Sequence, residues 1–467
     1  MLAAALVLSA VLQPADPASL KVLWTVPLKS HSFGGGAVAD VNADGIADVA
    51  FCTYFGDSRV MVLSGKDGAK IWEYSDGDHC YDASCKFADV DGDGKLDLIA
   101  PCSSGCAVLC FDAATGAVKW KTFLGEGECI DTPPWIGDTD DDGRKDIVVG
   151  TFKGRLHVLC GKDGSIARKL QVVPDPADGK AFNAIQTCPL VLDVNGDGSK
   201  DFIAGVFSRR EMDLGIYAVS GKDGSRLWRV PLTASVYHGP ALGLDKATGK
   251  RLLTFGCYDG HVRQVDAATG TVLWDQPTAD PYIMAPCVLA DTDRNGTEEI
   301  MWTSSHFGGF HLTGKSLFTQ TSTNNPYETI NRGVSVADLN GDARPECALL
   351  TSLGRFRVVS EGRVLHEFDG SHLCGTNAPA SDGAHGPVLA DFNGDGLLDA
   401  FFVVSGGGAM GADGKRLEKY GAAVCLTGFT GKADHINGWY MFRHDSENSG
   451  NAATPLDPFL AKHIPVR

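Results

Sequence analysis

The chain has 467 residues, among them 57 glycines, with 43% hydrophobic residues and a formal net charge of -17. Many glycines without long helical periodicity favour an all-β protein, and the apolar content is ample for packed sheets. No basic stripe accompanies the negative charge, so we expect no nucleic-acid partner, because binding phosphates requires clustered Lys and Arg.

The chain opens with the apolar segment MLAAALVLSAVLQ. This segment is too short to cross a bilayer and is typical of a signal peptide, although it starts without Lys or Arg. We therefore expect residues 1–19 to be a signal peptide, and the protein to be secreted, periplasmic or at the cell surface. No later run of residues is apolar enough to predict a membrane span.

Seven copies of a nine-residue acidic phrase follow, beginning with DVNADGIAD at Asp40, and the most regular is DVDGDGKLD at Asp89. Each copy has oxygen-bearing side chains at positions 1, 3, 5 and 9, and glycine is usual at position 6. Calcium prefers six to eight oxygen ligands, whereas magnesium keeps its waters. Strand-like sequence follows each copy directly, where an EF-hand would continue to a glutamate. The phrase therefore predicts calcium-binding turns between strands, and acidic turns without an ion are the alternative.

The predicted calcium ligands are the residues at positions 1, 3, 5 and 9 of each copy. They are Asp40, Asn42, Asp44 and Asp48; Asp89, Asp91, Asp93 and Asp97; Asp138, Asp140, Asp142 and Asp146; Asp193, Asn195, Asp197 and Asp201; Asp291, Asp293, Asn295 and Glu299; Asp338, Asn340, Asp342 and Glu346; and Asp391, Asn393, Asp395 and Asp399. Arg294 lies inside one copy, and Ala343 replaces the glycine of another. We expect those two sites to be weaker or empty, which gives five to seven calcium ions.

The copies begin about 50 residues apart, except for a gap of 98 residues between Asp193 and Asp291. A degenerate unit, with Asp245 and Gly249 in its turn, fills this gap, so the count is eight. The units begin near residues 33, 82, 132, 184, 238, 284, 332 and 385. A second phrase in each unit, such as VLSGKDGAKIW ending at Trp72, adds a hairpin. Four antiparallel strands per unit at this period predict an eight-bladed β-propeller, with a β-solenoid as the alternative.

The last unit lacks its fourth strand, and LKVLWTVPL around Trp24 matches the missing sequence. We expect residues 20–28 to complete the last blade and thereby remove an open sheet edge. This gives a single propeller domain over residues 20–430 and a C-terminal tail over residues 431–467.

The sequence contains 14 cysteines, some in strands and some at matching repeat positions. Cys110 lies in a strand and is expected to be a small buried apolar residue. Cys80 and Cys129 precede their acidic phrases by the same nine residues, and disulfides there remain open in an oxidising compartment. Zinc is less favoured because compact CxxC pairs are missing from the sequence.

In a propeller, the loops between blades lie on the face opposite the acidic turns. Histidine, tyrosine, arginine and acidic residues fall in these loops, and such a ring at a propeller mouth is a candidate ligand site. The candidates are His79, Glu128, Arg209, Arg210, Tyr237, His238, His306 and His385. The alternative is that each is a separately solvated loop residue.

The acidic repeat resembles the FG-GAP or VCBS repeat of integrin α-chain propellers and of exported bacterial proteins. The phrases DAATGAVKW and DAATGTVLW resemble the tryptophan-docking repeat of quinoprotein, PQQ-type propellers, which have eight blades. The resemblance covers residues 20 to about 450 and implies calcium bound for structure, at the ligand positions given above.

We therefore expect a secreted, calcium-stabilised, monomeric propeller that acts as a non-catalytic binding or adhesion module for a glycan or protein. The alternatives are a carbohydrate-active enzyme resembling polysaccharide lyases, a quinoprotein-like dehydrogenase and a purely structural surface-layer protein. The sequence has no adjacent Cys-Cys pair, which argues against the dehydrogenase. No motif selects a catalytic residue.

Overall fold

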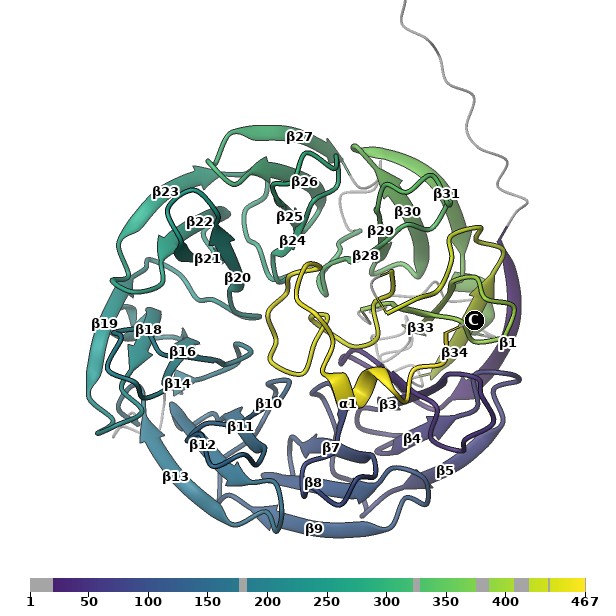
Figure 1. The fold of residues 1–467 in the computed structure, drawn as a ribbon, viewed down its shortest axis with the longest axis horizontal. Helices are drawn as coiled ribbons and strands as arrows, with labels where there is room; N and C mark the ends of the chain where they lie inside the picture. Colours follow the sequence, from purple (N-terminus) through teal and green to yellow (C-terminus); the bar gives the residue numbers. More distant parts are fainter. Residues whose placement is uncertain are drawn as a thin grey trace, which may run out of the picture.

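The computed structural model describes residues 20–175, 183–321, 328–374, 386–406, 420–435 and 437–466. Eight four-stranded antiparallel sheets form the blades of a ring (Figure 1). In blades 1 to 7 the strands follow chain order outward, from a short inner strand to a curved outer strand at the rim. The prediction of an all-β, eight-bladed propeller is confirmed.

The first four blades contain strands β2 to β19. Their bounds are β2 (Ala37–Ala39), β3 (Asp48–Cys52), β4 (Val60–Leu63) and β5 (Lys70–Tyr74) in blade 1; β6 (Lys86–Ala88), β7 (Asp97–Cys102), β8 (Ala107–Asp112) and β9 (Val118–Phe123) in blade 2; β10 (Trp135–Gly137), β11 (Asp146–Gly150), β12 (Arg155–Cys160) and β13 (Ile166–Gln171) in blade 3; and β15 (Leu190–Leu192), β16 (Asp201–Gly205), β18 (Gly215–Val219) and β19 (Arg226–Pro231) in blade 4. A separate pair, β14 (Asn183–Ala184) and β17 (Phe207–Ser208), and a 3-10 helix (Glu211–Asp213) lie in the connections of blade 4.

The last four blades contain strands β20 to β34 and β1. Their bounds are β20 (Ala241–Asp245), β21 (Lys250–Gly256), β22 (His261–Asp266) and β23 (Val272–Pro277) in blade 5; β24 (Val288–Ala290), β25 (Glu299–Thr303), β26 (His306–His311) and β27 (Ser316–Thr321) in blade 6; β28 (Ser335–Ala337), β29 (Glu346–Leu350), β30 (Arg355–Ser360) and β31 (Arg363–Asp369) in blade 7; and β32 (Val388–Ala390), β33 (Asp399–Gly406), β34 (Tyr420–Thr427) and β1 (Lys21–Leu28) in blade 8. A 3-10 helix (Ser371–Cys374) and the helix α1 (Pro458–Ala461) complete the regular structure.

Blade 5 is the degenerate unit. Its inner strands β20 and β21 join through a turn in which Gly249 N donates to Asp245 O at 2.7 Å, and Asp245 also accepts from Thr248 Oγ1 at 2.5 Å. Gly249 has φ +71°, a conformation that glycine adopts readily. A turn without the acidic comb therefore still forms a complete blade.

The N-terminal strand closes the ring. β1 pairs antiparallel with β34, from Lys21 opposite Thr427 to Leu28 opposite Gly421. This strand is the outer strand of blade 8, so the first and last strands of the propeller lie in one sheet (Figure 1). The predicted closure is confirmed, and it leaves no unpaired seam at which another chain could add a strand.

Tryptophans on the outer strands connect neighbouring blades. Trp24 Nε1 donates to Gly65 O of blade 1 at 2.5 Å, and Trp72 Nε1 donates to Ala113 O of blade 2 at 2.7 Å. Trp120, Trp228 and Trp274 make the same bond to the blade that follows each of them. Gly68 packs on the Trp24 ring, where a Cβ atom would lie 2.7 Å from the indole. The repeated phrase that ends in tryptophan therefore connects each blade that carries it to the next one.

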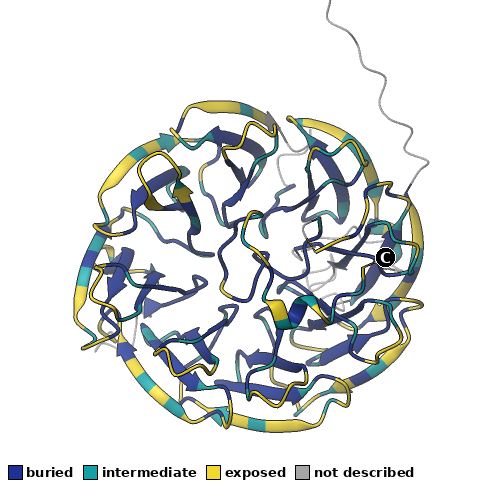
Figure 2. Cartoon of the chain, viewed as in Figure 1, coloured by how far each residue is buried: buried dark blue, intermediate teal, exposed yellow. Residues whose placement is uncertain are grey.

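The middle strands are buried on both faces. Every residue of β3, β7 and β11 is buried, whereas the residues of the outer strands β5, β9 and β13 are mostly exposed or half-buried (Figure 2). Both faces of these middle strands pack against neighbouring blades, which explains their continuous apolar runs in the sequence. Burial of this kind contributes about 1.5–3 kcal/mol per large apolar side chain.

The C-terminal tail lies inside the ring rather than outside it (Figure 1). Inner strands of five blades donate backbone hydrogen bonds of 2.8–2.9 Å to it. The donor–acceptor pairs are Leu389 N to Trp439 O, Val38 N to Tyr440 O, Ile136 N to Ser446 O, Leu242 N to Ser449 O and Leu289 N to Gly450 O. Trp439, Tyr440 and Met441 are almost fully buried. We call residues 437–451 the plug, because this segment fills the centre of the ring.

Two buried cations anchor the plug. Lys86 Nζ donates to Asp445 O at 2.5 Å and to Asn448 Oδ1 at 2.6 Å, and Lys86 is fully buried. Burial lowers the pKa of Lys86 to about 8. Arg443 donates to the carbonyls of His238, Gly239 and Pro240 in blade 5. The plug is therefore bound by side chains as well as by strand pairing.

Within the described residues, no helix is long and apolar enough to cross a membrane. The cysteines whose side chains the structure describes have free thiols, and Cys110 is buried in a strand as expected. The thiols of Cys106 and Cys129 approach to 4.0 Å. The predicted signal peptide, residues 1–19, lies outside the described residues.

Candidate functional site

The acidic turns share one fold, which is built by the position-1 carboxylate. Asp89 accepts from Gly92 N at 2.8 Å and from Gly94 N at 3.1 Å, while the carboxylates of Asp91 and Asp93 each accept from the N–H group two residues later. The other six turns repeat the bond from position 6 to position 1 and the two bonds that follow. Asx-type bonding of this kind explains why Asp and Asn alternate in the phrase.

The position-9 acid fastens each turn to the blade. Val90 N donates to Asp97 Oδ2 at 3.0 Å, and the equivalent bond is present in all seven copies. Burial raises the pKa of Asp48, Glu346 and Asp399 to about 7, although backbone hydrogen bonds oppose the shift. Other carboxylates of each turn raise it further. A cation here would offset both the burial and the repulsion.

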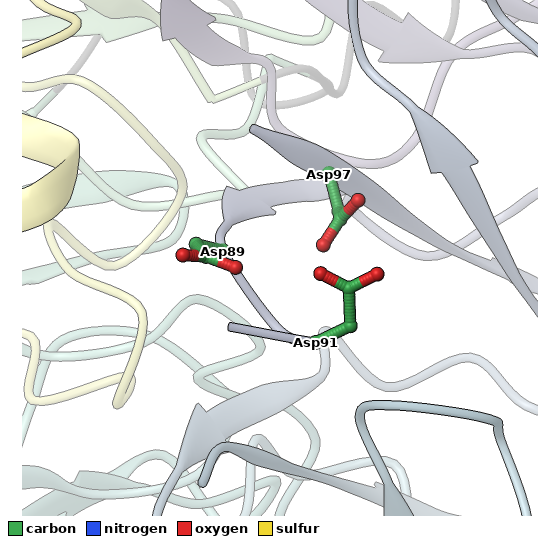
Figure 3. A group of neighbouring side chains, drawn as sticks. All are labelled: Asp89, Asp91 and Asp97. Atoms are coloured by element: carbon green, nitrogen blue, oxygen red, sulfur yellow. The ribbon is translucent and has the colours of Figure 1, made fainter. Parts of the chain in front are cut away.

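Three turns bring their carboxylates together. The groups are Asp89, Asp91 and Asp97; Asp138, Asp140 and Asp142; and Asp291, Asp293 and Glu299. In each group one oxygen per residue lies within 4.8 Å of the others, and Figure 3 shows the first group with its carboxylates facing a common space. Oxygen ligands in a tight turn match the requirements of calcium.

A lysine pairs with the most regular turn. Lys119 Nζ, on β9, lies 2.7 Å from Asp97 Oδ1 and 3.5 Å from Asp93 Oδ2, and it also contacts Asp91. Burial opposes its charged form, but the hydrogen bonds to Asp91 and Asp97 raise the pKa of Lys119. Sequence reasoning ranked this turn by its own residues and missed the lysine, which is 22 residues away from Asp97 along the chain.

The two irregular turns keep the common fold. Arg294 occupies position 4 with φ +59°, a left-handed conformation, and its turn still gathers Asp291, Asp293 and Glu299. Ala343 occupies position 6 with φ +72°, where the other copies have glycine. A non-glycine residue in this region is strained by about 1 kcal/mol or more. Lower affinity at these two turns stays a prediction.

On the opposite face, several predicted ligand residues instead form local pairs. Burial acts to raise the pKa of Glu128, but hydrogen bonds with His157, Thr151 and Arg155 lower it to about 2. His306 Nδ1 lies 2.8 Å from Asp280 Oδ1. These pairs belong to the connections of single blades and do not converge.

The remaining predicted ligand residues are placed differently. Arg210 pairs with Asp213 at 3.2 Å, while His79 and Arg209 are exposed. His385 lies outside the described residues. Of the predicted set, the structure brings together only Tyr237 and His238 among the residues it describes.

A cluster forms around these two residues at the centre of the opposite face. Its members come from inter-blade connections of blades 2, 3, 4, 5 and 7, just before the innermost strands. We call it the central cluster and define it as Asp82, Asp131, Gln186, Tyr237, His238 and Arg332.

Arg332 holds the central cluster together. Its Nη1 lies 2.9 Å from His238 Nε2, and its guanidinium lies 5.9 Å from the Tyr237 ring centroid and 5.6 Å from that of Phe33. It also interacts electrostatically with Asp82 and Asp131. One side chain from blade 7 thus reaches residues of blades 1, 2, 3 and 5, which places the cluster at the axis.

The two carboxyl groups of the cluster are strongly perturbed. Burial and the neighbouring Asp131 raise the pKa of Asp82 to about 7, and Arg332 acts in the opposite direction. Burial also raises the pKa of Asp131, against hydrogen bonds from Ser103 at 2.5 Å and Gln186 at 3.0 Å. Perturbed carboxyls at the centre of a face are typical of functional sites.

Several buried polar atoms of this region have no hydrogen-bond partner. They are Asp82 Oδ1, Gln186 Oε1, His238 Nδ1 and Asn331 Oδ1. Gln186 is only 6% exposed and His238 only 2% exposed. Buried polar groups usually have a partner, so four unpartnered atoms within one cluster and its direct neighbour make this region a candidate binding site.

Sequence reasoning found two of the six cluster residues, although the sequence contained a signal for three of the others, Asp82, Asp131 and Gln186. Phe33, Asp82, Asp131, Gln186, His238, Met284 and Asn331 all stand seven residues before the first position of their turns. The residue types differ between blades, so a search for a repeated phrase misses them. Their shared place in the repeat predicts a ring of side chains at the axis.

Two family models match parts of the chain. An FG-GAP-like repeat matches residues 40–100, and a model described as outer membrane protein assembly factor BamB matches residues 213–300. The first match covers blade 1 without β2 and the start of blade 2, and the second covers parts of blades 4 to 6. The repeats identified in the sequence are therefore confirmed.

Two curated proteins match part of the chain. A polyvinylalcohol dehydrogenase from Pseudomonas sp is 24% identical over 203 residues, 38% of this chain and 31% of that protein. Protein FAM234B from Mus musculus is 27% identical over 183 residues, 34% of this chain and 29% of that protein. The chain thus covers about a third of the length of each of these relatives.

A solved structure covers most of the chain. The quinohemoprotein alcohol dehydrogenase from Comamonas testosteroni aligns with a TM-score of 0.61 at 13% identity, over 89% of this chain and 77% of that one. Identity this low shows a shared fold alone. The chain is an eight-bladed β-propeller that carries FG-GAP-like and PQQ-like repeats.

Proposed function

We propose that this protein is a secreted binding module, in which calcium in the acidic turns stiffens one face and the central cluster on the other face binds a ligand. The observation that carries the proposal is the separation of these two sets of residues. The acidic turns fasten strands within a blade, whereas the central cluster collects unpartnered polar atoms from several blades.

Calcium is proposed for five to seven of the acidic turns. The residues at positions 1, 3, 5 and 9 would hold the ion, as in Asp138, Asp140, Asp142 and Asp146 of blade 3. An ion there would neutralise carboxylates that repel each other and would keep the buried position-9 acid ionised. Its role would be structural, because each turn connects two strands of one blade.

Export is proposed from the apolar segment at residues 1–19. Calcium is abundant outside cells, so turns of moderate affinity would stay filled there. Mass spectrometry of the protein recovered from the medium or the periplasm tests this. A product that starts within residues 10–20 is expected, whereas an intact Met1 in a cytoplasmic product would refute export.

A dehydrogenase is the second candidate, because the polyvinylalcohol dehydrogenase matches 38% of the chain. Pyrroloquinoline quinone is a flat tricarboxylate, so its site needs an excess of cationic groups. In the central cluster the guanidinium of Arg332 instead faces the two carboxyls of Asp82 and Asp131. These residues do not fit the cofactor, and we derive no catalytic step from it.

One experiment separates the two candidates. The purified protein is incubated with calcium and screened on arrays of glycans and extracellular proteins, and in parallel with pyrroloquinoline quinone, alcohols and a redox dye. A binding module retains an array ligand and reduces no dye. Dye reduction that depends on the protein and the quinone would overturn the proposal in favour of the dehydrogenase.

A further inference from the structure

The central cluster and the residues around it present acceptors without donors. Asp82 Oδ1, Gln186 Oε1 and Asn331 Oδ1 are buried oxygens to which no described group donates a hydrogen bond. They come from blades 2, 4 and 7, all at the position seven residues before the acidic turn. A ligand that satisfies oxygens arranged around an axis must bring several hydrogen-bond donors spaced around its own edge.

The charge of the cluster disfavours an anion and does not demand a cation. Asp82 and Asp131 contribute two acidic groups, and Arg332 contributes one positive charge. The raised pKa values of the two carboxyls mean that burial already works against their ionised forms. A phosphate or carboxylate would meet two acids, whereas a neutral ligand with hydroxyl groups can donate to the same oxygens without adding charge.

An aromatic wall of four side chains begins at Tyr237, which interacts electrostatically with the carboxyls of Asp82 and Asp131. The rings of Tyr237 and Tyr258 are nearly parallel, at 3° with centroids 6.3 Å apart. Phe207 meets both rings edge-on, and Tyr282 contacts Tyr258 at 5.7 Å. All four side chains are half-buried. Aromatic faces of this kind pack against the apolar C–H surface of a ring whose rim is polar.

From these observations we infer that the central cluster binds one residue of a neutral glycan, with its hydroxyls on the oxygens of Asp82, Gln186 and Asn331 and its C–H face on Tyr258 and Tyr237. This inference rests on the proposed binding function and names its ligand class. Arg332 lies between the acidic and aromatic parts, and its hydrogen bond to His238 fixes its position. It is a positioning residue that fixes the two carboxyls relative to the aromatic side chains.

The test uses the full chain in excess calcium, so that the acidic turns play no part in the result. Neutral oligosaccharides built from glucose, xylose, mannose or N-acetylglucosamine are titrated by calorimetry. A dissociation constant of about 10 μM to 1 mM is expected for at least one of them. Sugar phosphates, putrescine and magnesium serve as the anionic and cationic probes, and none is expected to compete.

Four variants locate the site. Gln186→Leu and Asp82→Asn remove or alter an acceptor, and Tyr258→Ala removes part of the wall; each is expected to weaken binding at least tenfold. His79→Ala, exposed on the same face, is the matched control and is expected to bind normally. Melting temperatures show whether each variant is folded. If Tyr258→Ala is not folded, Tyr258→Leu replaces it, because leucine fills the space without an aromatic face.

Three results would overturn the inference. Tight binding of putrescine, magnesium or a sugar phosphate in place of oligosaccharides would assign a charged ligand. Oligosaccharide binding that the folded variants leave unchanged would place the glycan elsewhere on the propeller, while the proposed binding function would stand. Binding of an array protein but of no oligosaccharide would likewise refute the glycan and keep the binding module.

Discussion

The ammonium of Lys119 lies 2.7 Å from the carboxylate of Asp97, inside the most regular of the acidic turns. The lysine therefore neutralises part of the negative charge that calcium is proposed to neutralise. Its ammonium group must move away from the carboxylates if an ion binds. Ion pairs that are partly exposed stabilise by about 1 kcal/mol or less, which is small enough for a divalent cation to displace one.

Lys119→Gln should lower the melting temperature in chelator and increase the rise produced by calcium, because the carboxylates lose their internal counter-ion while the proposed calcium ligands remain. Thermal melts in chelator and in calcium measure both effects. Lys121→Gln is the control on the same strand, since Lys121 pairs with Asp76 outside the turn. Equal calcium responses in the two variants would contradict competition by Lys119.

Without the proposed calcium ions, stability should fall as the pH rises from 5 to 8. The pKa values of Asp48, Glu346 and Asp399 are about 7 in the fold and about 4 in the unfolded chain, so the fold binds more protons between these values. Their stabilising effect is complete below pH 4 and is lost as the pH passes 7.

This pH effect is measured as the melting temperature in chelator, with a decrease of about 5 °C or more expected between pH 5 and pH 8. In excess calcium the bound ion favours the ionised acids, so the same curve should be much flatter. Identical curves with and without calcium would count against ion binding at the turns.

Deletion of residues 20–28 should give an unstable or aggregating protein. The deletion removes β1 and exposes the edge of β34, and it also removes Trp24, whose burial and bond to Gly65 connect blades 8 and 1. Light scattering and thermal melts measure the result. A deletion of residues 1–19 alone is the control and should melt normally; a soluble, normally melting protein without residues 20–28 would disprove the closure role.

Lys86→Ala should destabilise far more than Lys145→Ala. Both lysines connect a blade to the C-terminal tail, but Lys86 is fully buried and bonds the plug, whereas Lys145 pairs with Asp457 where both side chains are 23% exposed. Losing the buried donor leaves Asn448 Oδ1 without that partner, at a cost of about 2–4 kcal/mol. Urea unfolding compares the two variants, and similar losses would contradict the anchoring role.

Ala343→Gly should stabilise the protein by about 0.5–1 kcal/mol, because glycine adopts φ +72° without strain. The control is Ala348→Gly in β29, which should destabilise because glycine loses more conformational freedom in a strand. The midpoints of urea unfolding of the two variants, measured in chelator, test this prediction. A loss of stability in Ala343→Gly would show that the methyl group makes contacts that outweigh the strain.

The blade count and the closure were predictable because they rest on local repetition. Each unit repeats its own strands and turns, and the match between Trp24 and Trp72 is visible in sequence alone. Even the degenerate turn at Asp245 was identifiable from the gap that it fills. Repeat proteins make such predictions reliable, since every unit meets the same packing requirement.

The plug and the central cluster were not predictable in the same way. The contact of Lys86 with Asn448 joins residues 362 positions apart. No repeated sequence pattern predicts that the tail lies in the centre of the ring. The cluster residues share a repeat position but differ in chemistry, as Asp82 and Gln186 do, so their convergence follows from the ring rather than from a motif. Lys119 was missed for the same reason within a single blade, because the repeated acidic phrase does not reveal its contact with Asp97.

The plug also determines when the molecule can finish folding. Its backbone pairs with inner strands of five blades, and β1 at the other end of the chain pairs with β34. Neither contact can form until residues 420–451 have been synthesised, so the propeller has an open seam and an empty centre up to that point. Folding that depends on such distant contacts is slow and exposes apolar edges. We expect the ring to close in one late step, once residues 420–451 are available, with a need for chaperones until then.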